Sequence, residues 1–445
     1  MISFVPNIIF VIVFCFAIFL FSKNVRKIYR NINLGISIDR TDNKKTRLVQ
    51  MLRIAFGQSK MIDKPVVGLL HIVVYVGFLV INIELLEIIV DGVLGTHRVF
   101  APLLGSFYNF LIAFFEIFAL LVIVSVIVFW IRRNMLSIKR FLSLEMKGWP
   151  KNDANIILYV EIILMGLFLT MNGADLWIQQ NAPEFNYASA GSFPVSQYLL
   201  PLFDGLSSNV VFVIERSAWW LHIIGILCFL NYLYYSKHLH ILLAFPNTFY
   251  ANLQPKGQFN NLSSVTKEVR MMMDPDADPY AMPEEGAEEE IPEKFGASDV
   301  TDLNWVQLLN AYTCTECGRC TSSCPANMTG KELSPRAIMM KTRDRLEEVG
   351  KNIDSNKGVF KDDGKQLLND YITPEELWAC TSCNACVEEC PIDIDPLSII
   401  MDMRRFLVME QSAAPQELNM MMTNIENNGA PWQYNQQDRL NWKDE

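Results

Sequence analysis

Residues 314–325 read Cys-Thr-Glu-Cys-Gly-Arg-Cys-Thr-Ser-Ser-Cys-Pro, and residues 380–391 read Cys-Thr-Ser-Cys-Asn-Ala-Cys-Val-Glu-Glu-Cys-Pro. Both runs have the form C-x2-C-x2-C-x3-C-P, and together they hold eight of the ten cysteines in the chain. Chance rarely produces the same long pattern twice. The two runs therefore predict a pair of matching metal-cluster sites.

The spacing of each run is typical of [4Fe-4S] binding. Three thiolates separated by two residues each can bind three corners of one cubane, while the fourth cysteine ligates the other cluster. A pair of zinc sites is the alternative, but zinc needs only four ligands and explains neither the third cysteine step nor the prolines. On this rule Cys314, Cys317, Cys320 and Cys390 bind one cluster, and Cys380, Cys383, Cys386 and Cys324 bind the other.

The composition indicates a membrane protein with a soluble part. The chain has 445 residues, of which 51% are hydrophobic, and the apolar residues are concentrated before position 245. Such a chain is too long for one domain and too apolar for an ordinary soluble protein. The net charge of -10 argues against a nucleic acid partner. No disulfide framework is indicated, and the clusters suggest a reducing compartment.

Five apolar segments are long enough to cross a bilayer as helices, which needs about 20 residues. The first lacks the basic start and the cleavage site of a signal peptide, so we expect a retained anchor. Lysine and arginine gather after the first and third segments, which predicts an N-terminus outside and a cytoplasmic C-terminal part in a multi-pass inner-membrane protein. The segments run from Ile2 to Phe21, Val66 to Val90, Phe107 to Ile131, Ile156 to Ile178, and Val210 to Tyr235.

Histidines in and beside these spans are candidate haem ligands, because ionisable groups in a membrane are usually functional. In one continuous helix, His222 and His240 would share a face about 27 Å apart along the axis. His71 matches His240 in depth, which predicts a bis-histidine b-type haem between them, and His238 could replace His240. Ile81 stands where a partner for His222 would lie, so one haem is favoured over two. The alternative is a set of interfacial histidines.

Further polar residues lie in the spans and could form a quinone pocket or a proton path. Two of them, Glu87 and Glu161, lie near helix ends and could instead reach water. The set comprises Asn82, Glu84, Glu87, Glu116 and Glu161.

The remainder divides into a linker and a helical domain. Residues 271–298 are rich in proline and acidic residues and cannot bury a core, which predicts a tether, with an acidic docking strip as the alternative. Ser334-Pro335 and Thr373-Pro374 are helix starts, and 396–409 is a further helix. We therefore expect a mainly α fold, with a five-helix transmembrane bundle followed by an α-helical ferredoxin domain. The predicted boundaries are 1–245 for the membrane domain, 246–300 for the linker, 301–410 for the two-cluster domain and 411–445 for a partner-docking tail.

The five spans and their histidines resemble the cytochrome b subunit of respiratory nitrate reductase. The soluble part, with its Cys-Thr-Glu-Cys-Gly-Arg-Cys run and the segments 330–336 and 427–432, resembles the iron-sulfur module of heterodisulfide reductases and related oxidoreductases. The resemblance implies that His71 and His240 bind the cytoplasm-proximal haem and that His222 corresponds to a distal ligand. Single-chain relatives continue into cysteine-rich CCG domains. Since no cysteine follows Cys390 here, the resemblance implies a separate CCG-domain subunit or an electron-transfer flavoprotein as partner.

These observations predict an oxidoreductase subunit that is active within a respiratory complex. Electrons would pass between a cytoplasmic partner, two [4Fe-4S] clusters, haem b and the quinone pool in the lipid membrane. No residue needs to act as acid, base or nucleophile, because cofactors carry the redox chemistry. Two alternatives remain: a non-enzymatic membrane anchor or redox sensor, and quinone reacting directly with a cluster without haem.

Overall fold

The computed structural model describes residues 4–275 and 294–444. Within these ranges the regular structure is helical, and β pairing is limited to two isolated bridges. This confirms the mainly α fold predicted from the sequence. Much of the acidic segment predicted to be a tether, residues 276–293, lies outside the described residues.

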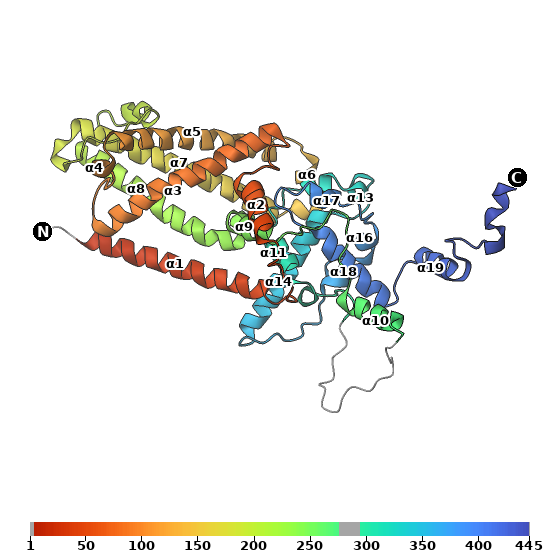
Figure 1. The fold of residues 1–445 in the computed structure, drawn as a ribbon. Helices are drawn as coiled ribbons and strands as arrows, with labels where there is room; N and C mark the ends of the chain where they lie inside the picture. The colour runs from red at the N-terminus through yellow and green to blue at the C-terminus, as the bar shows by residue number, and fades with distance from the viewer. Residues whose placement is uncertain (1–3, 276–293, 445) are drawn as a thin grey trace.

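Five helices are long and apolar enough to cross a membrane, as predicted. The first four extend beyond the apolar segments seen in the sequence, because polar turns continue these helices into the interface, whereas the fifth ends at Tyr232, before the predicted Tyr235. Figure 1 shows α3, α5, α7 and α8 gathered in a bundle, with α1 along one side. The helices are α1 (Val5–Ile32), α3 (Pro65–Leu94), α5 (Ser106–Asn134), α7 (Trp149–Asn181) and α8 (Ser208–Tyr232).

Large apolar side chains cover the outside of this bundle. Phe107 is 56% exposed, Leu69 is 64% exposed and Val213 is 60% exposed. Extended apolar surface of this kind marks a site of interaction with a membrane or another protein. A lipid surface is the environment that these residues fit. Short helices connect the spans: α2 (Lys44–Met51), η1 (Leu52–Phe56), α4 (Ala101–Leu104), α6 (Lys139–Leu142), η2 (Leu144–Met146), η3 (Pro183–Phe185) and η4 (Ser196–Leu202).

The fifth span does not continue to His240, and the expectation of one helix carrying both His222 and His240 is wrong. After α8 the chain forms η5 (Leu233–Tyr235), an extended Ser236, η6 (Lys237–Leu239) and then α9 (His240–Phe249). The break is held by hydrogen bonds. The backbone N–H of Lys237 donates to Asp153 Oδ2 at 3.1 Å, and that of His238 donates to Ser236 Oγ at 3.1 Å.

The soluble domain is built from short helices whose starts follow from the sequence. Ser334 Oγ accepts from the Ala337 N–H, and Thr373 forms a capping box with Glu376, so both predicted helix starts are present. Its elements are α10 (Ser263–Met273), η7 (Val300–Asp302), α11 (Trp305–Thr313), α12 (Arg319–Ser322), α13 (Pro325–Met328), α14 (Pro335–Ser355), α15 (Leu367–Asp370), α16 (Pro374–Trp378), α17 (Ala385–Glu388), α18 (Pro396–Met409), α19 (Gln416–Asn428) and η8 (Gln436–Lys443).

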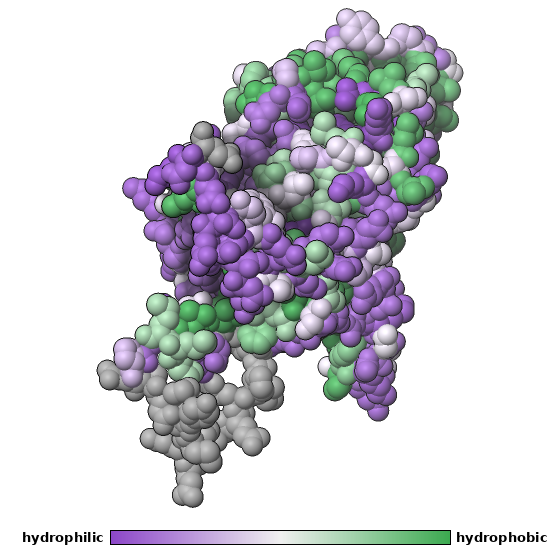
Figure 2. All heavy atoms as spheres, turned by 90° about the vertical axis from the view of Figure 1, so that its right-hand side faces the viewer, coloured by the Kyte–Doolittle hydropathy of each residue, from purple (hydrophilic) through white to green (hydrophobic). Residues whose placement is uncertain are grey.

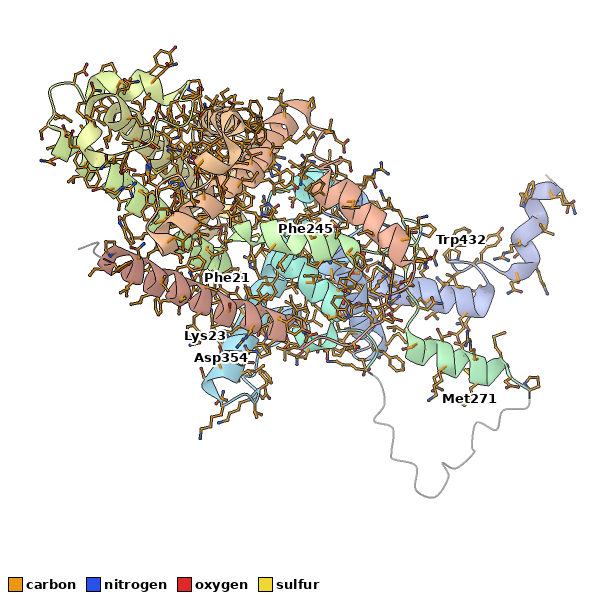
Figure 3. The ribbon with its side chains drawn as sticks, turned by 60° about the vertical axis from the view of Figure 1, so that its left-hand side comes forward. Phe21, Lys23, Phe245, Met271, Asp354 and Trp432 are labelled. Carbon is orange, nitrogen blue, oxygen red and sulfur yellow. The ribbon has the colours of Figure 1, made fainter. Side chains whose placement is uncertain are left out.

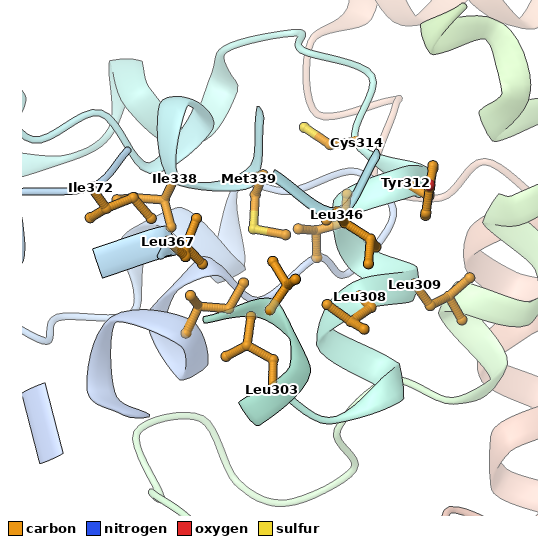
Figure 4. Close-up of a cluster of buried hydrophobic side chains, with 14 of the residues drawn as sticks. Leu303, Leu308, Leu309, Tyr312, Cys314, Ile338, Met339, Leu346, Leu367 and Ile372 are labelled. Atoms are coloured by element: carbon orange, nitrogen blue, oxygen red, sulfur yellow. The ribbon is translucent and has the colours of Figure 1, made fainter. Parts of the chain in front are cut away.

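A continuous core lies beneath the cysteine loops and reaches into the membrane part. Leu303, Leu308, Ile338 and Leu346 are fully buried at its centre (Figure 4). Ile32 from α1 belongs to the same core. Seen from the side of the soluble domain, hydrophilic residues dominate the surface (Figure 2).

Polar contacts fix the soluble domain against the end of the bundle. The Ile36 N–H donates to Leu303 O at 2.8 Å, and the Asn31 amide donates to the Tyr312 hydroxyl at 2.9 Å. Lys27, near the end of α1, forms an ion pair with Asp354 at 2.7 Å. Figure 3 shows Asp354 beside α1. The cysteines are therefore held at one end of the membrane helices.

Candidate electron-transfer site

The two cysteine runs adopt the same backbone form. In the first run Glu316 has φ 55° and Gly318 has φ 73°, while at the matching positions of the second run Ser382 has φ 57° and Asn384 has φ 60°. A one-turn helix follows in each case, α12 or α17. Left-handed residues are typical of backbone nests, in which successive N–H groups form an anion-binding concavity that suits an anionic cluster. The sequence repeat is thus also a structural repeat.

The structure brings the cysteines together in the two predicted groups. Burial raises the pKa of Cys390, and the thiols of Cys317 and Cys314 raise it further. The pKa of Cys386 is raised to about 12 by burial and by negative neighbours that include Cys380 and Cys324.

Each fourth cysteine is therefore an electrostatic neighbour of cysteines of the other run, as the ferredoxin rule requires. Within the described residues, no three Cys, His, Asp or Glu side chains are close enough to share one metal ion. A cubane binds each thiolate at a separate iron. The donor set consists of eight thiols, buried or half-buried except for the exposed Cys383, and it fits two [4Fe-4S] clusters. Their ligation by these cysteines remains a prediction.

Cations and N–H donors surround the first group. Lys60 donates to the carbonyl oxygen of Cys390 at 3.2 Å and forms an ion pair with Asp393 at 2.6 Å. Arg319 donates to the carbonyl oxygen of Lys60 at 3.0 Å, so the loop before α3 is tied to the first cysteine run. The Ile394 N–H lies 3.3 Å from Cys390 Sγ. Such groups stabilise the negative charge of a thiolate-bound cluster.

Arg404 has the corresponding place beside the second group. Its Nε donates to the carbonyl oxygen of Leu377 at 3.0 Å, and its guanidinium lies 4.9 Å from the ring centroid of Trp378. The Ser382 N–H lies 3.4 Å from Cys380 Sγ. Sequence reasoning missed both Arg404 and Lys60, because neither lies inside a cysteine run.

Three of the predicted haem ligands lie together at the end of the bundle next to the cysteines. The rings of His238 and His240 are 5.4 Å apart, and His240 Nδ1 lies 3.1 Å from Lys237 O. Burial lowers the pKa of His238 well below its usual value, and the neighbouring His240 and His71 lower it further. His71 is also an electrostatic neighbour of Arg319. The histidine group therefore borders the first cysteine run.

The chemistry of this histidine group fits one haem. An axial ligand must be a neutral imidazole, and burial keeps the imidazoles of His238 and His240 neutral. His71 Nδ1 is buried and has no hydrogen-bond partner among the described residues. His222 lies apart, in the middle of α8, where its Nδ1 is 3.0 Å from Leu164 O and its ring packs on Phe168. The structure does not bring His222 to the other three histidines.

Of the polar residues predicted in the spans, three belong to one buried region and two do not. Glu87 accepts a hydrogen bond from the Tyr108 hydroxyl at 2.8 Å, and Glu116 accepts one from the Asn172 amide at 3.2 Å. Glu84 is buried near both. Asn82 is exposed, and Glu161 takes no part in these contacts. No pattern in the sequence indicates that Arg98, from a connecting loop, lies among these carboxylates.

Comparison with known proteins places the cysteine loops in a described family. Residues 313–394 match the family of 4Fe-4S dicluster domains. The chain is 28% identical to the probable iron-sulfur-binding oxidoreductase FadF of Bacillus subtilis, over 98% of this chain and 61% of that protein. It is 26% identical to EtfAB:quinone oxidoreductase of Syntrophomonas wolfei, over 92% of this chain and 55% of that protein. The chain thus spans less than two thirds of either relative.

Shorter matches include a component of the ferredoxin/F(420)H(2)-dependent CoB-CoM heterodisulfide reductase of Methanosarcina acetivorans. The identity there is 32%, over 24% of this chain and 53% of that component. No solved structure matches the chain. These findings confirm the resemblance to heterodisulfide-reductase-like proteins: the chain is a membrane-type relative of iron-sulfur oxidoreductases, and it carries their 4Fe-4S dicluster domain.

Proposed function

We propose that this chain is a membrane-anchored electron-transfer subunit that connects a soluble redox partner with the quinone pool. The observation that carries the proposal is the contact zone between the two candidate cofactor sites. Arg319, inside the first cysteine run, is an electrostatic neighbour of His71, while Lys60 in the loop before α3 contacts Cys390. Electrons that leave the first cluster would therefore have a haem site directly beside it.

The exposure of the cysteines indicates the order in which the two clusters would carry electrons. Cys383 of the second group is exposed, whereas none of the four cysteines of the first group is: Cys314 is buried, and Cys317, Cys320 and Cys390 are half-buried. An exposed ligand allows a partner to approach its cluster closely, so the second cluster would exchange electrons with the soluble partner. The first cluster would then pass electrons to or from the membrane part. The protein supplies position and electrostatics, and the cofactors supply the redox chemistry.

The haem would be held by His71 and His240, with His238 as the substitute for His240. A bis-histidine haem supplies one-electron transfer when bound. His71 comes from α3, His240 from α9 and His238 from the short turn before it, so the site depends on the break at Ser236. His222 offers a single buried ring elsewhere, which favours one haem.

The partner and the sidedness rest on the relatives and on charge. The name of the relative EtfAB:quinone oxidoreductase gives EtfAB and quinone as its reaction partners. We propose the same classes here, with an electron-transfer flavoprotein or a CCG-domain subunit docking beside Cys383 on the cytoplasmic side. The basic residues after the first and third spans support this orientation in the inner membrane.

The proposal is tested on the purified complex in two steps. A pyridine haemochrome spectrum should show b-type haem in the wild type and none in His71→Ala or His240→Ala, while the cluster spectra persist. A quinol analogue should reduce the clusters of the wild type, or reduced clusters should reduce the quinone. If neither reaction occurs, the chain is an anchor or a sensor. If quinone reacts but the wild type lacks haem, electrons pass directly between a cluster and quinone.

A further inference from the structure

The end of the bundle farthest from the soluble domain holds the loop between α3 and α4 (Figure 1). A polar cavity lies there between α3, α7 and α8. The span helices and the loop that follows α3 line this cavity, and they contribute more acidic than basic side chains to it. The acidic residues are Glu84, Glu87, Asp91, Asp175 and Glu215, and the others with ionisable groups are His97, Arg98 and Arg216.

Both arginines of the cavity are already engaged by carboxylates. Arg98 Nε donates to Asp175 Oδ2 at 2.6 Å, and its other nitrogens donate to Tyr108 and Asn172. Arg216 forms an ion pair with Glu215. Two of the five acidic residues are thus neutralised by the two permanent positive charges.

Two more carboxylates are satisfied by neutral donors. Asp91 accepts from the Arg98 backbone N–H at 2.7 Å and from the Thr96 hydroxyl at 2.5 Å. Glu87 accepts from the Phe100 N–H at 2.9 Å and from the Tyr108 hydroxyl. Hydrogen bonds of this kind stabilise the ionised form of a carboxyl group.

Glu84 differs from the other carboxylates of the cavity. It is 3% exposed, and its Oε2 is buried with no hydrogen bond from any described residue. The charged groups around it are Arg98, Glu87, Glu116 and Asp175, of which three are acidic. A buried carboxylate with no partner is very costly, and a proton removes that cost without any further ligand. Glu84 is therefore suited to hold a proton.

The cavity connects two environments. Toward the end of the bundle, His97 is 24% exposed and lies 3.5 Å from Asp175, while the Arg216 side chain is 32% exposed. Toward the bundle interior, Trp219 lines the cavity, and His222 lies three residues further along the same face of α8. Glu84 lies between water at this end and the apolar interior.

We propose that Glu84 is the proton-exchange group of the quinone reaction, on the side of the membrane opposite the cysteines. This inference rests on the proposed function and extends it. Oxidation of one quinol to quinone breaks two O–H bonds and releases two electrons and two protons. The electrons leave one at a time toward the clusters. Each proton binds Glu84 Oε2 and then passes to water past Asp175 and His97, and the reduction of quinone reverses every step.

The test compares Glu84→Gln with wild type in the intact complex, reconstituted in vesicles. Glutamine has the shape of the protonated carboxyl group, so the variant should fold, bind its cofactors and melt like the wild type. Reduction of the clusters by dithionite should also be unchanged. Cluster reduction by the quinol analogue should slow about 100-fold, as expected for the loss of one proton-transfer group. Glu184→Gln, on the exposed loop after α7, is the matched control and should react at the wild-type rate.

An infrared difference spectrum gives a second readout. The wild type should show the carbonyl stretch of a protonated carboxyl group that responds to reduction, and Glu84→Gln should lack it. A wild-type quinol rate in Glu84→Gln, with that band still present, would overturn the inference and leave the proposed function standing. No quinol reaction in the wild type would overturn both.

Discussion

One buried carboxylate connects the first cysteine loop to the segment that carries His238 and His240. Glu316 lies between Cys314 and Cys317, and its side chain is 2% exposed. It forms ion pairs with Lys237, the residue before His238, and with Arg343 of α14 at 2.9 Å. The three residues come from three different segments. Their interaction therefore sets the position of the first cluster relative to the histidines.

Replacing Glu316 by Gln should weaken this junction strongly. Lys237 and Arg343 have side chains that are only 9% and 15% exposed, and the change removes the nearer carboxylate from both buried cations. Lys237 then keeps Asp153 at 3.8 Å, and Arg343 keeps Asp344 at 3.3 Å. Breaking a buried ion pair costs about 3–5 kcal/mol. Lys237 still donates a hydrogen bond to the Pro150 carbonyl oxygen at 2.7 Å. We therefore expect a cost at the lower end of this range, about 3 kcal/mol. At this cost, the equilibrium constant for opening of the first cysteine loop rises about 100-fold.

The assay is iron release from the first cluster to a chelator under anaerobic conditions. Release should be about 100-fold faster in Glu316→Gln than in wild type, while Glu375→Gln, which alters an exposed carboxylate, should behave as wild type. Cluster-specific electron paramagnetic resonance identifies which cluster is lost. If Glu316→Gln releases iron at the wild-type rate, the junction does not hold the loop.

Acid should weaken the same junction in the wild type. Burial raises the pKa of Glu316, but Lys237 and Arg343 lower it more, so the folded-state pKa lies below its usual value. The stabilisation is therefore fully present above the unfolded-state pKa and is lost as the pH falls through the folded-state pKa. Iron release from wild type should accelerate over that window and should do so less in Glu316→Gln.

Three further changes give independent tests. Cys383→Ser should abolish the second cluster and keep the first, so that iron content falls by half and one cluster signal disappears; two intact clusters would contradict the assignment. Leu346→Ala should cost about 2–5 kcal/mol because Leu346 is fully buried, and a lower melting temperature of the soluble domain would show it. Gly318→Ala should weaken cluster binding, because Gly318 has φ 73° and an added Cβ would lie 2.4 Å from Arg336 Nη1; unchanged cluster occupancy would refute this.

The fold class and the dicluster domain could be predicted because both depend on local patterns. Apolar length identifies a span whatever surrounds it, and a repeated cysteine spacing identifies a cluster loop. The helix break after α8 could not be predicted. Ser236 becomes extended because Asp153, from another helix, accepts the Lys237 N–H. The sequence 222–240 alone therefore reads as one helix.

The polar groups around the cysteines and in the buried region of the bundle could not be predicted for the same reason. Lys60 reads as one more basic residue of a cytoplasmic loop, yet it contacts the backbone of Cys390 far along the chain. Arg98 reads as a loop residue, yet it is 7% exposed among the carboxylates of three helices. Contacts between distant segments decide both cases, and no local pattern reports them.

We propose that electrons pass between the clusters and the quinone through a haem held by His71 and His240. The most direct measurement is rapid mixing of the oxidised wild-type complex and its His71→Ala variant with a quinol analogue, while haem and cluster absorption are followed separately. Haem and clusters should both be reduced in wild type, whereas the variant should lack haem and its clusters should stay oxidised. Clusters that are reduced by quinol equally fast in the haem-free variant would contradict it.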